Sequence, residues 1–267
     1  MLAKVFLALC QIPVFRRLVW KPIYNYLAKM ELRDWSFMNY GYEPLDGRPK
    51  LQLLPKDEEE RYAAQLYHYL AINTEIKDKD VLEVGSGRGG GASHIKRYLH
   101  PKTMVGMDLA QNAVDLSNKK HQVDGLKYIQ GNAEKLPFEA NSFDVIINVE
   151  SCHAYGSMTN FLSEVHRVLR PNGIFLCTDM RLKHKISIWE EELNASGLKM
   201  LDIKTINDNV VKAIELDHDR KMKRIESDEF SEKIKKAFGE FAGIRGSKIH
   251  LDFASGERIY KWYKMQK

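Results

Sequence analysis

The chain has 267 residues, 44% of them hydrophobic and 10% aromatic, which is enough for one sizeable folded domain with additions. The formal net charge of +5 is mild and no basic stripe interleaved with aromatic residues is present, so composition does not favour nucleic-acid binding. The three cysteines, Cys10, Cys152 and Cys177, form no CxxC pair, which disfavours a disulfide framework or a zinc site and favours a reducing compartment, the cytoplasm.

The N-terminal segment is basic and rich in aromatic residues. Its first 30 residues hold five basic residues and no acidic one, and its apolar run is shorter than the ~20 residues of a membrane-spanning helix. Such a segment can lie in a membrane interface, cover an apolar substrate, or simply pack on the domain; a mitochondrial targeting segment is a further alternative. We predict residues 1–45 as an amphipathic or lid segment and keep peripheral membrane contact through residues 1–30 open.

Short apolar strands alternate with amphipathic helices through the remainder, residues 46–267. This alternation predicts a Rossmann-like α/β fold, with a mostly parallel seven-stranded sheet covered by helices on both faces. The charged stretch 207–241 has a helical pattern and is predicted as a helical insertion that caps the strand ends before the last strand. The predicted strands are residues 80–85, 102–109, 126–133, 142–150, 174–180, 199–206 and 256–265.

A glycine cluster, EVGSGRGGG, follows the first predicted strand. Gly85, Gly87 and Gly89 permit a tight turn and close approach of the backbone to a nucleotide-like ligand. Asp108 ends the second strand 23 residues after Gly85, where a carboxylate can accept both ribose hydroxyls. Sites for NAD and for S-adenosylmethionine (SAM) share these features.

Glu83 separates the two cofactors. It lies two residues before Gly85, where a dinucleotide pyrophosphate would meet an unfavourable negative charge. SAM carries an ammonium and a sulfonium and no phosphate, so a carboxylate there favours SAM; the alternative is a buried acid that accepts hydrogen bonds from backbone amides. The third strand ends in GNAEKLPF, where Asn132 and Ala133 are expected beside the adenine.

The ordered series ExGxGxG, the acid ending the second strand, NAExLPF, FDVI and LRPNG resembles the class I SAM-dependent methyltransferases. Within that class, LPFEANSFDVIINVESCHAY, FLSEVHRVLRPNG and FGEFAGIRGSKI resemble the phthiotriol/phenolphthiotriol dimycocerosates methyltransferases, which methylate a hydroxyl of a long polyketide lipid. Fatty-acid and microcystin-type O-methyltransferases are more distantly similar. The resemblance covers residues 35–265 and implies SAM as the cofactor and a hydrophobic acceptor. The expected cofactor contacts are Glu83, Gly85, Ser86, Gly87, Asp108, Leu109, Asn132, Ala133, Asn148 and Tyr42.

The loop NVESCHAYGS (residues 148–157) carries the candidate chemistry. Transfer of a methyl group to an alcohol requires loss of a proton, and His153 is the candidate base because imidazole titrates near neutral pH. Glu150 is the second catalytic candidate: it can orient the imidazole, contact the ammonium of SAM, or act as the base. Both also have structural interpretations, a loop hydrogen bonder and a helix-start acid, and Cys152 is interpreted as a small packing residue.

Other residues complete the predicted site. Tyr40 or Tyr42 can contact the sulfonium by a cation–π interaction, or pack on the core. Tyr155 and Arg181 are predicted to contact the substrate, although Arg181 can instead pair with Asp179. No metal is predicted. A carboxyl methyltransferase that forms methyl esters and a non-catalytic SAM-binding partner protein remain alternatives to the O-methyltransferase.

Overall fold

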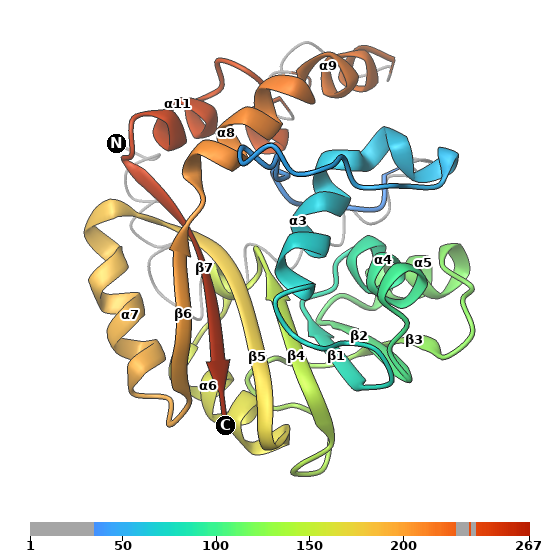
Figure 1. The fold of residues 1–267 in the computed structure, drawn as a ribbon, viewed down its shortest axis with the longest axis vertical. Helices are drawn as coiled ribbons and strands as arrows, with labels where there is room; N and C mark the ends of the chain where they lie inside the picture. The colour runs from blue at the N-terminus through green and yellow to red at the C-terminus, as the bar shows by residue number, and fades with distance from the viewer. Residues whose placement is uncertain (1–34, 228–234, 236–238) are drawn as a thin grey trace.

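The computed structural model describes residues 35–227, 235 and 239–267. Seven strands form one sheet in the order β3-β2-β1-β4-β5-β7-β6 (Figure 1). Neighbours from β3 to β5 are parallel, and β7 runs antiparallel to both β5 and β6. The predicted seven-stranded, mostly parallel α/β fold is therefore confirmed. The strands are β1 Asp80–Val84, β2 Thr103–Asp108, β3 Leu126–Gln130, β4 Phe143–Val149, β5 Leu169–Leu182, β6 Lys199–Thr205 and β7 Arg258–Gln266.

Helices cover both faces because the central strands are apolar on both sides. Residues of α3, α4 and α5 pack in one buried cluster, and residues of α6 and α7 pack in the other. In β4, five consecutive residues from Val145 to Val149 are buried, as expected for a central parallel strand. The helices are η1 Pro55–Glu60, α3 Arg61–Ala71, α4 Gly90–Leu99, α5 Gln111–Lys120, η2 Cys152–Ala154, α6 Met158–Val168, η3 Lys183–Lys185, α7 Ile186–Asn194, α8 Asn207–Leu216, α9 His218–Ser227 and α11 Lys248–Ala254.

Strand β5 is longer than the sequence pattern predicts. The prediction began it at residue 174 and interpreted LRPNG as a helix stop, but the strand begins at Leu169, which pairs with Phe143 of β4. The end of the chain supports this extension: Asn172 N donates to Lys267 O, and Lys267 N donates to Gly173 O (3.1 and 3.0 Å). A contact with the last residue of the chain has no local sequence signal.

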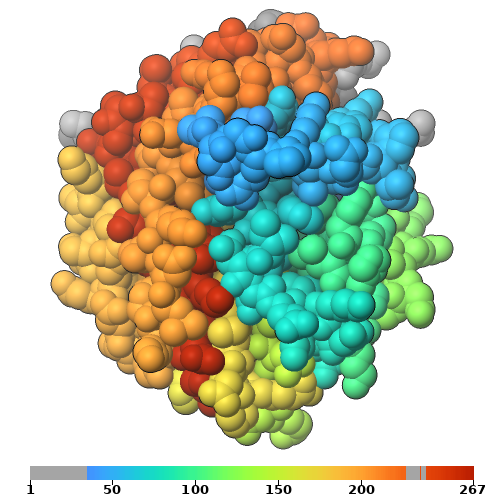
Figure 2. All heavy atoms as spheres, viewed as in Figure 1, coloured from blue at the N-terminus to red at the C-terminus, as the bar shows by residue number. Residues whose placement is uncertain are grey.

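The described residues within 207–254 lie over the end of the sheet where the parallel strands finish, and we call them the cap. Figure 1 shows α8, α9 and α11 at this end, with the segment that follows residue 35 beside them. In Figure 2 this first described segment, in blue, lies against the orange α8–α9 region and the teal residues that follow it. We call residues 35–42 the strap.

The predicted amphipathic segment within residues 1–30 lies outside the described residues, as does part of the predicted insertion at 207–241. Residues 207–227 of that insertion form α8 and α9. In the parts of the chain that the structure describes, no helix is both long and apolar enough to cross a membrane.

Candidate active site

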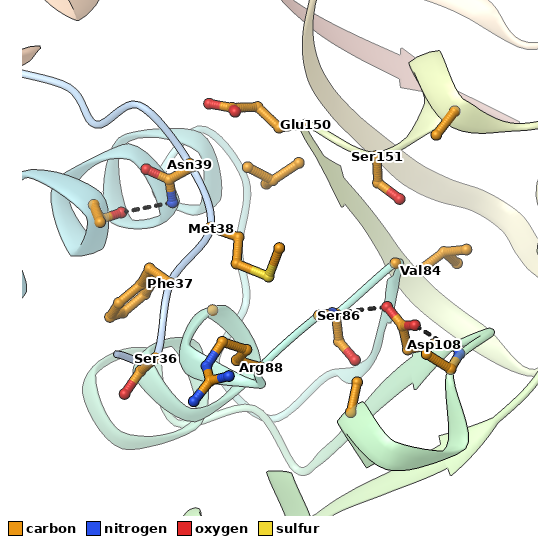
Figure 3. Close-up of a pocket in the computed structure, with 18 of the residues that line it drawn as sticks. Ser36, Phe37, Met38, Asn39, Val84, Ser86, Arg88, Asp108, Glu150 and Ser151 are labelled. Carbon is orange, nitrogen blue, oxygen red and sulfur yellow. Dashed lines mark hydrogen bonds between the residues drawn. The ribbon is translucent and has the colours of Figure 1, made fainter. Parts of the chain in front are cut away.

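A cavity of about 230 Å³ lies between the carboxyl ends of the parallel strands, the strap and the cap. Figure 3 shows side chains of the strap, the glycine loop, β2 and the end of β4 converging on it. This is the edge at which parallel α/β sheets bind ligands. Most of its lining comes from residues 35–40, 84–88, 107–110, 131–134, 149–156 and 220–225.

The glycine loop after β1 needs its glycines for both conformation and space. Gly85 and Gly87 have φ angles of 81° and 52°, in the left-handed region that favours glycine. A Cβ on Gly85 would lie 1.8 Å from Ser151 Oγ, whereas one on Gly87 would meet only the Met38 sulfur, at 3.5 Å. The loop is therefore packed at Gly85 and open to a ligand at Gly87.

Asp108 faces the same cavity from the end of β2. Its Oδ2 accepts a hydrogen bond from Gly87 N and its Oδ1 accepts one from Ala110 N, both at 2.9 Å. Burial raises the pKa of this carboxyl, and these backbone donors act in the opposite direction. A carboxylate oxygen can accept more than one hydrogen bond, so Asp108 retains capacity for ligand hydroxyls. Leu109, Asn132 and Ala133 also line the cavity.

Ser86 supplies a further test of whether these residues fit SAM. Its Oγ is buried and has no hydrogen-bond partner among the described residues, yet Ser86 lines the cavity. Buried polar atoms are nearly always satisfied, so an orphaned hydroxyl beside a cavity marks a position for a polar ligand atom. With the open approach at Gly87 and the Asp108 carboxylate, this side of the cavity fits a ribose-bearing cofactor.

Two predicted cofactor contacts lie behind the loop instead of in the cavity. Glu83 is fully buried, accepts a 2.6 Å hydrogen bond from the Tyr67 hydroxyl, and does not line the cavity. Burial raises its pKa to about 7, and the Tyr67 hydrogen bond opposes this shift. Asn148 is also fully buried and donates to Val84 O at 2.8 Å. Both residues support the loop from behind it, and their contact with the cofactor, which for Glu83 the sequence allows directly or through water, stays a prediction; Glu83 Oε2 is buried and has no hydrogen-bond partner among the described residues.

His153 lies on the other side of the cavity and is paired with Asp179. The imidazole Nδ1 lies 2.9 Å from Asp179 Oδ1, and His153 N donates to Oδ2, also at 2.9 Å. Asp179 is fully buried, which alone would raise its pKa. The charges of His153 and Arg181 outweigh burial and hold this pKa well below its usual range. A neutral imidazole that donates its Nδ1 proton to a carboxylate presents Nε2 as its proton acceptor.

Arg181 does not reach the cavity. Its Nη1 lies 3.2 Å from Asp179 Oδ2, and its guanidinium stacks 4.1 Å from the ring centre of Trp189. Of the two alternatives raised by the sequence, the structure supports pairing with Asp179, because the side chain fills its hydrogen-bonding and stacking sites within the fold. A contact of Arg181 with the substrate stays an untested prediction.

The three candidate tyrosines are placed differently. Tyr42 is buried, stacks on Tyr69 with ring centres 4.1 Å apart, and does not line the cavity, as expected for the alternative in which it packs on the core. Tyr40, from the same strap, does line it. Tyr155 lines it too, with its hydroxyl 2.7 Å from Ser151 Oγ.

Glu150 lines the cavity but is not the partner of His153. Its Oε1 accepts hydrogen bonds from Tyr40 N at 2.9 Å and from the Tyr260 hydroxyl. Burial is the largest cause that raises its pKa, to about 8. The carboxylate in contact with the imidazole is therefore that of Asp179, and not that of Glu150 as the sequence suggested.

Several lining residues were not identified from the sequence. Phe37 and Met38 lie on the strap next to the tyrosines that were considered, and the aromatic run WSFMNYGY was the available signal. Asp179, which does not line the cavity, was considered as a residue that could reach the cleft or pair with Arg181, and its contact with His153 was not foreseen. No group of three or more histidine, cysteine or acidic side chains with metal-binding geometry occurs within residues 35–227 and 239–267.

Comparison with known proteins agrees with this geometry. The family model described as a methyltransferase domain matches residues 82–177. The chain is 42% identical to a fatty-acid O-methyltransferase of Mycolicibacterium smegmatis, over 73% of this chain and 71% of that one. It is 38% identical to a phthiotriol/phenolphthiotriol dimycocerosates methyltransferase of Mycobacterium tuberculosis, over 85% of this chain and 83% of that one.

Solved structures share the fold at low sequence identity. The [4+2]-cyclase SpnF superposes with a TM-score of 0.70 at 18% identity, covering 92% of this chain and 94% of that chain. Geranyl diphosphate C-methyltransferase from Streptomyces coelicolor A3(2), solved with S-adenosylhomocysteine (SAH), gives 0.65 at 15% identity and covers 92% and 97%. These two show only the fold, whereas the relatives at 38–42% identity show the family. The chain belongs to the class I SAM-dependent methyltransferases, a family in which SAM is the methyl donor.

Proposed function

We propose that this enzyme transfers the methyl group of SAM to a hydroxyl oxygen of a hydrophobic lipid or polyketide acceptor, with His153 as the general base. The observation that carries this proposal is the 2.9 Å contact between His153 Nδ1 and the buried Asp179, next to the cavity that contains Gly87 and Asp108. A base is useful only if the acceptor arrives with a proton. The His153–Asp179 pair therefore favours an alcohol as the methyl acceptor.

The bound cofactor supplies an electrophilic methyl group on a sulfonium. As the acceptor oxygen forms its bond to that carbon, the carbon–sulfur bond breaks, neutral SAH leaves, and the hydroxyl proton passes to His153 Nε2. Asp179 stabilises the imidazolium through Nδ1, and the proton then returns to water. A positioned base of this kind contributes about 10²–10⁴-fold.

The lining of the cavity supports an apolar acceptor. Apolar side chains from the strap, β5 and the cap face the same space as His153. Burying such surface against a lipid chain yields about 25 cal/mol per Å². The names of the two relatives, a fatty-acid enzyme and a dimycocerosate enzyme, point in the same direction. The larger of these side chains include Phe37, Met38, Met180, Ile225 and Phe241.

A carboxylate acceptor is the second candidate, and two observations favour it. The relative at 42% identity is a fatty-acid O-methyltransferase, and Arg220, Lys221 and Arg224 of α9 line the cavity. A carboxylic acid has an ordinary pKa of about 4 and is already ionised at neutral pH. Its methylation would need orientation by cations rather than a base.

A matched pair of acceptors separates the candidates. Transfer from radiolabelled SAM is measured with a fatty alcohol and a fatty acid of equal chain length, for the wild type, His153→Ala and the control His166→Ala on α6. We expect methylation of the alcohol, reduced about 10²–10⁴-fold by His153→Ala and unchanged by His166→Ala. Methylation of the acid alone, insensitive to His153→Ala, would support the second candidate. SAM binding without transfer to either acceptor would support a non-catalytic partner protein.

A further inference from the structure

Glu150 occupies an unusual position at the junction of β4 and η2. Its φ angle is 45°, in the left-handed region that residues other than glycine rarely adopt, and its N donates to Thr178 O at 2.9 Å. Figure 3 shows the Glu150 and Ser151 side chains leaving the backbone on different sides, Glu150 toward the strap and Ser151 toward Val84. Strained residues of this kind cluster at functional sites, so the side chain merits a specific role.

The Glu150 carboxylate joins segments that are far apart in the sequence. Oε1 accepts from Tyr40 N on the strap and from the Tyr260 hydroxyl on β7, each 110 residues away. Oε2 accepts no hydrogen bond from the residues that the structure describes, and Glu150 lines the cavity. One oxygen therefore connects the strap to the sheet, while the other remains available to a ligand.

The charge state of Glu150 depends on its surroundings. Burial, with a smaller contribution from the negative charge of Asp179, raises the pKa of Glu150 to about 8, although the hydrogen bonds from Tyr260 and Tyr40 and the positive charge of Lys221 act in the opposite direction. A cation in the cavity would favour the ionised form, and a neutral ligand would not. The titratable groups facing it from the packed elements are Tyr67 on α3, Asp179 on β5, Lys221 on α9 and Tyr260 on β7.

We propose that Glu150 is a positioning residue that ties the strap to β7 over the cavity, and that its charge favours cationic SAM over neutral-sulfur SAH. The strap is then held more firmly before transfer than after it, which assists exchange of SAH for SAM. The inference depends on the cofactor alone. It can fail while transfer to an alcohol is confirmed, and it can hold if the acceptor proves to be a carboxylate.

Glu150→Gln is the matched variant, because glutamine keeps the length and the acceptor oxygen but carries no charge. Calorimetry at neutral pH measures the affinities for SAM and for SAH in the wild type and in the variant. We expect the variant to bind SAM about tenfold more weakly, because one solvent-screened contact between opposite charges contributes about that much to affinity. Its affinity for SAH should not change. Equal losses for both ligands, or no loss for either, would overturn the proposal.

Proton release on binding of SAM is a second measurement, and a purely structural role of Glu150 would not change it. Because SAM binding lowers the pKa of Glu150 from about 8, the wild type should release protons on binding below that pH, and its SAM affinity should rise with pH until the carboxyl is ionised. Calorimetry in buffers of different ionisation enthalpy measures this release. Glu150→Gln should release fewer protons than the wild type, and SAH should cause less release than SAM; equal release in all cases contradicts the proposal.

The Tyr260→Phe variant separates the hydrogen-bonded link between the strap and β7 from the charge of Glu150. This variant removes one donor to Oε1 and retains the carboxylate, so the preference for SAM over SAH should persist. Hydrogen exchange of the Tyr40 amide should be slower with SAM than with SAH in the wild type, and this difference should vanish in Glu150→Gln. If Glu150→Gln does not fold, loss of the SAM preference in the folded Tyr260→Phe variant would decide against a role for the charge.

Discussion

The two sides of the cavity are built in different ways. On the cofactor side, backbone groups and glycines form the surface, and Gly87 N and Asp108 are brought together by adjacent parallel strands. On the acceptor side, side chains from distant segments meet: His153 and Asp179 are 26 residues apart, and Glu150 and Tyr40 are 110 residues apart. The first side therefore depends on backbone shape, and the second depends on charges and protons.

This difference predicts different responses to substitution. A change on the cofactor side should affect binding of SAM through steric fit, largely independently of pH. On the acceptor side, a change at the His153–Asp179 pair should affect turnover while SAM still binds, because these groups act on the transferred proton, whereas a change at Glu150 should alter the preference for SAM over SAH and its dependence on pH. The following variants test this separation.

Asp179→Asn should have the largest effect. The substitution removes the charge that holds His153, so kcat toward an alcohol should fall about 10²–10⁴-fold while SAM affinity stays within about threefold, because Asp179 does not line the cavity. It should also lower the free energy of unfolding by about 3–5 kcal/mol, since Arg181 would lose its buried partner. Steady-state kinetics, calorimetry with SAM and urea unfolding measure these quantities.

The control for this variant is Asp202→Asn on β6, where an exposed carboxylate pairs with Lys204 at 3.3 Å. Loss of an exposed pair should cost less than about 1 kcal/mol and leave kcat unchanged. A loss of SAM affinity in Asp179→Asn as large as its loss of kcat would contradict the separation of the two sides.

Gly85→Ala should have the next largest effect and should act on binding. The new Cβ would lie 1.8 Å from Ser151 Oγ, at a φ of 81° that alanine rarely adopts, so the loop must shift. We expect SAM affinity to fall about a hundredfold, equivalent to ~2.7 kcal/mol, when measured by calorimetry. Gly47→Ala is a matched control, because Gly47 also has a positive φ (71°) but would place its Cβ more than 4 Å from other atoms. Equal SAM affinities of the two variants would show that the loop tolerates the clash.

Tyr42→Leu should have the smallest effect on function. It removes a ring that stacks on Tyr69 outside the cavity, so stability should fall by about 0.5–1.5 kcal/mol while SAM affinity stays within about threefold. Tyr69→Leu removes the other ring of the same stack and should behave alike. If Tyr42→Leu alone bound SAM tenfold more weakly, this result would support the cation–π contact between Tyr42 and the sulfonium that the sequence suggested.

Much of the fold could be predicted because it depends on local periodicity. Each of the seven predicted strands corresponds to an observed strand, since short buried runs between amphipathic helices encode a parallel sheet. The start of β5 at Leu169 was missed because it rests on pairing with Phe143 and with the end of the chain. The short helix α11 was missed as well.

The sequence by itself determined the sheet, because local periodicity encodes its strands, and it determined the glycine loop and the placement of Asp108, because these lie within one βαβ unit. Only the tertiary structure decided which carboxylate holds His153, which of the two strap tyrosines reaches the cavity, and that Glu83 lies behind the loop. The physical reason is that hydrogen bonds and burial depend on distances between side chains from separate segments. The sequence NVESCHAYGS contains the candidate groups on the acceptor side of the cavity. The structure shows that His153 contacts Asp179 and that Glu150 accepts a hydrogen bond from the strap.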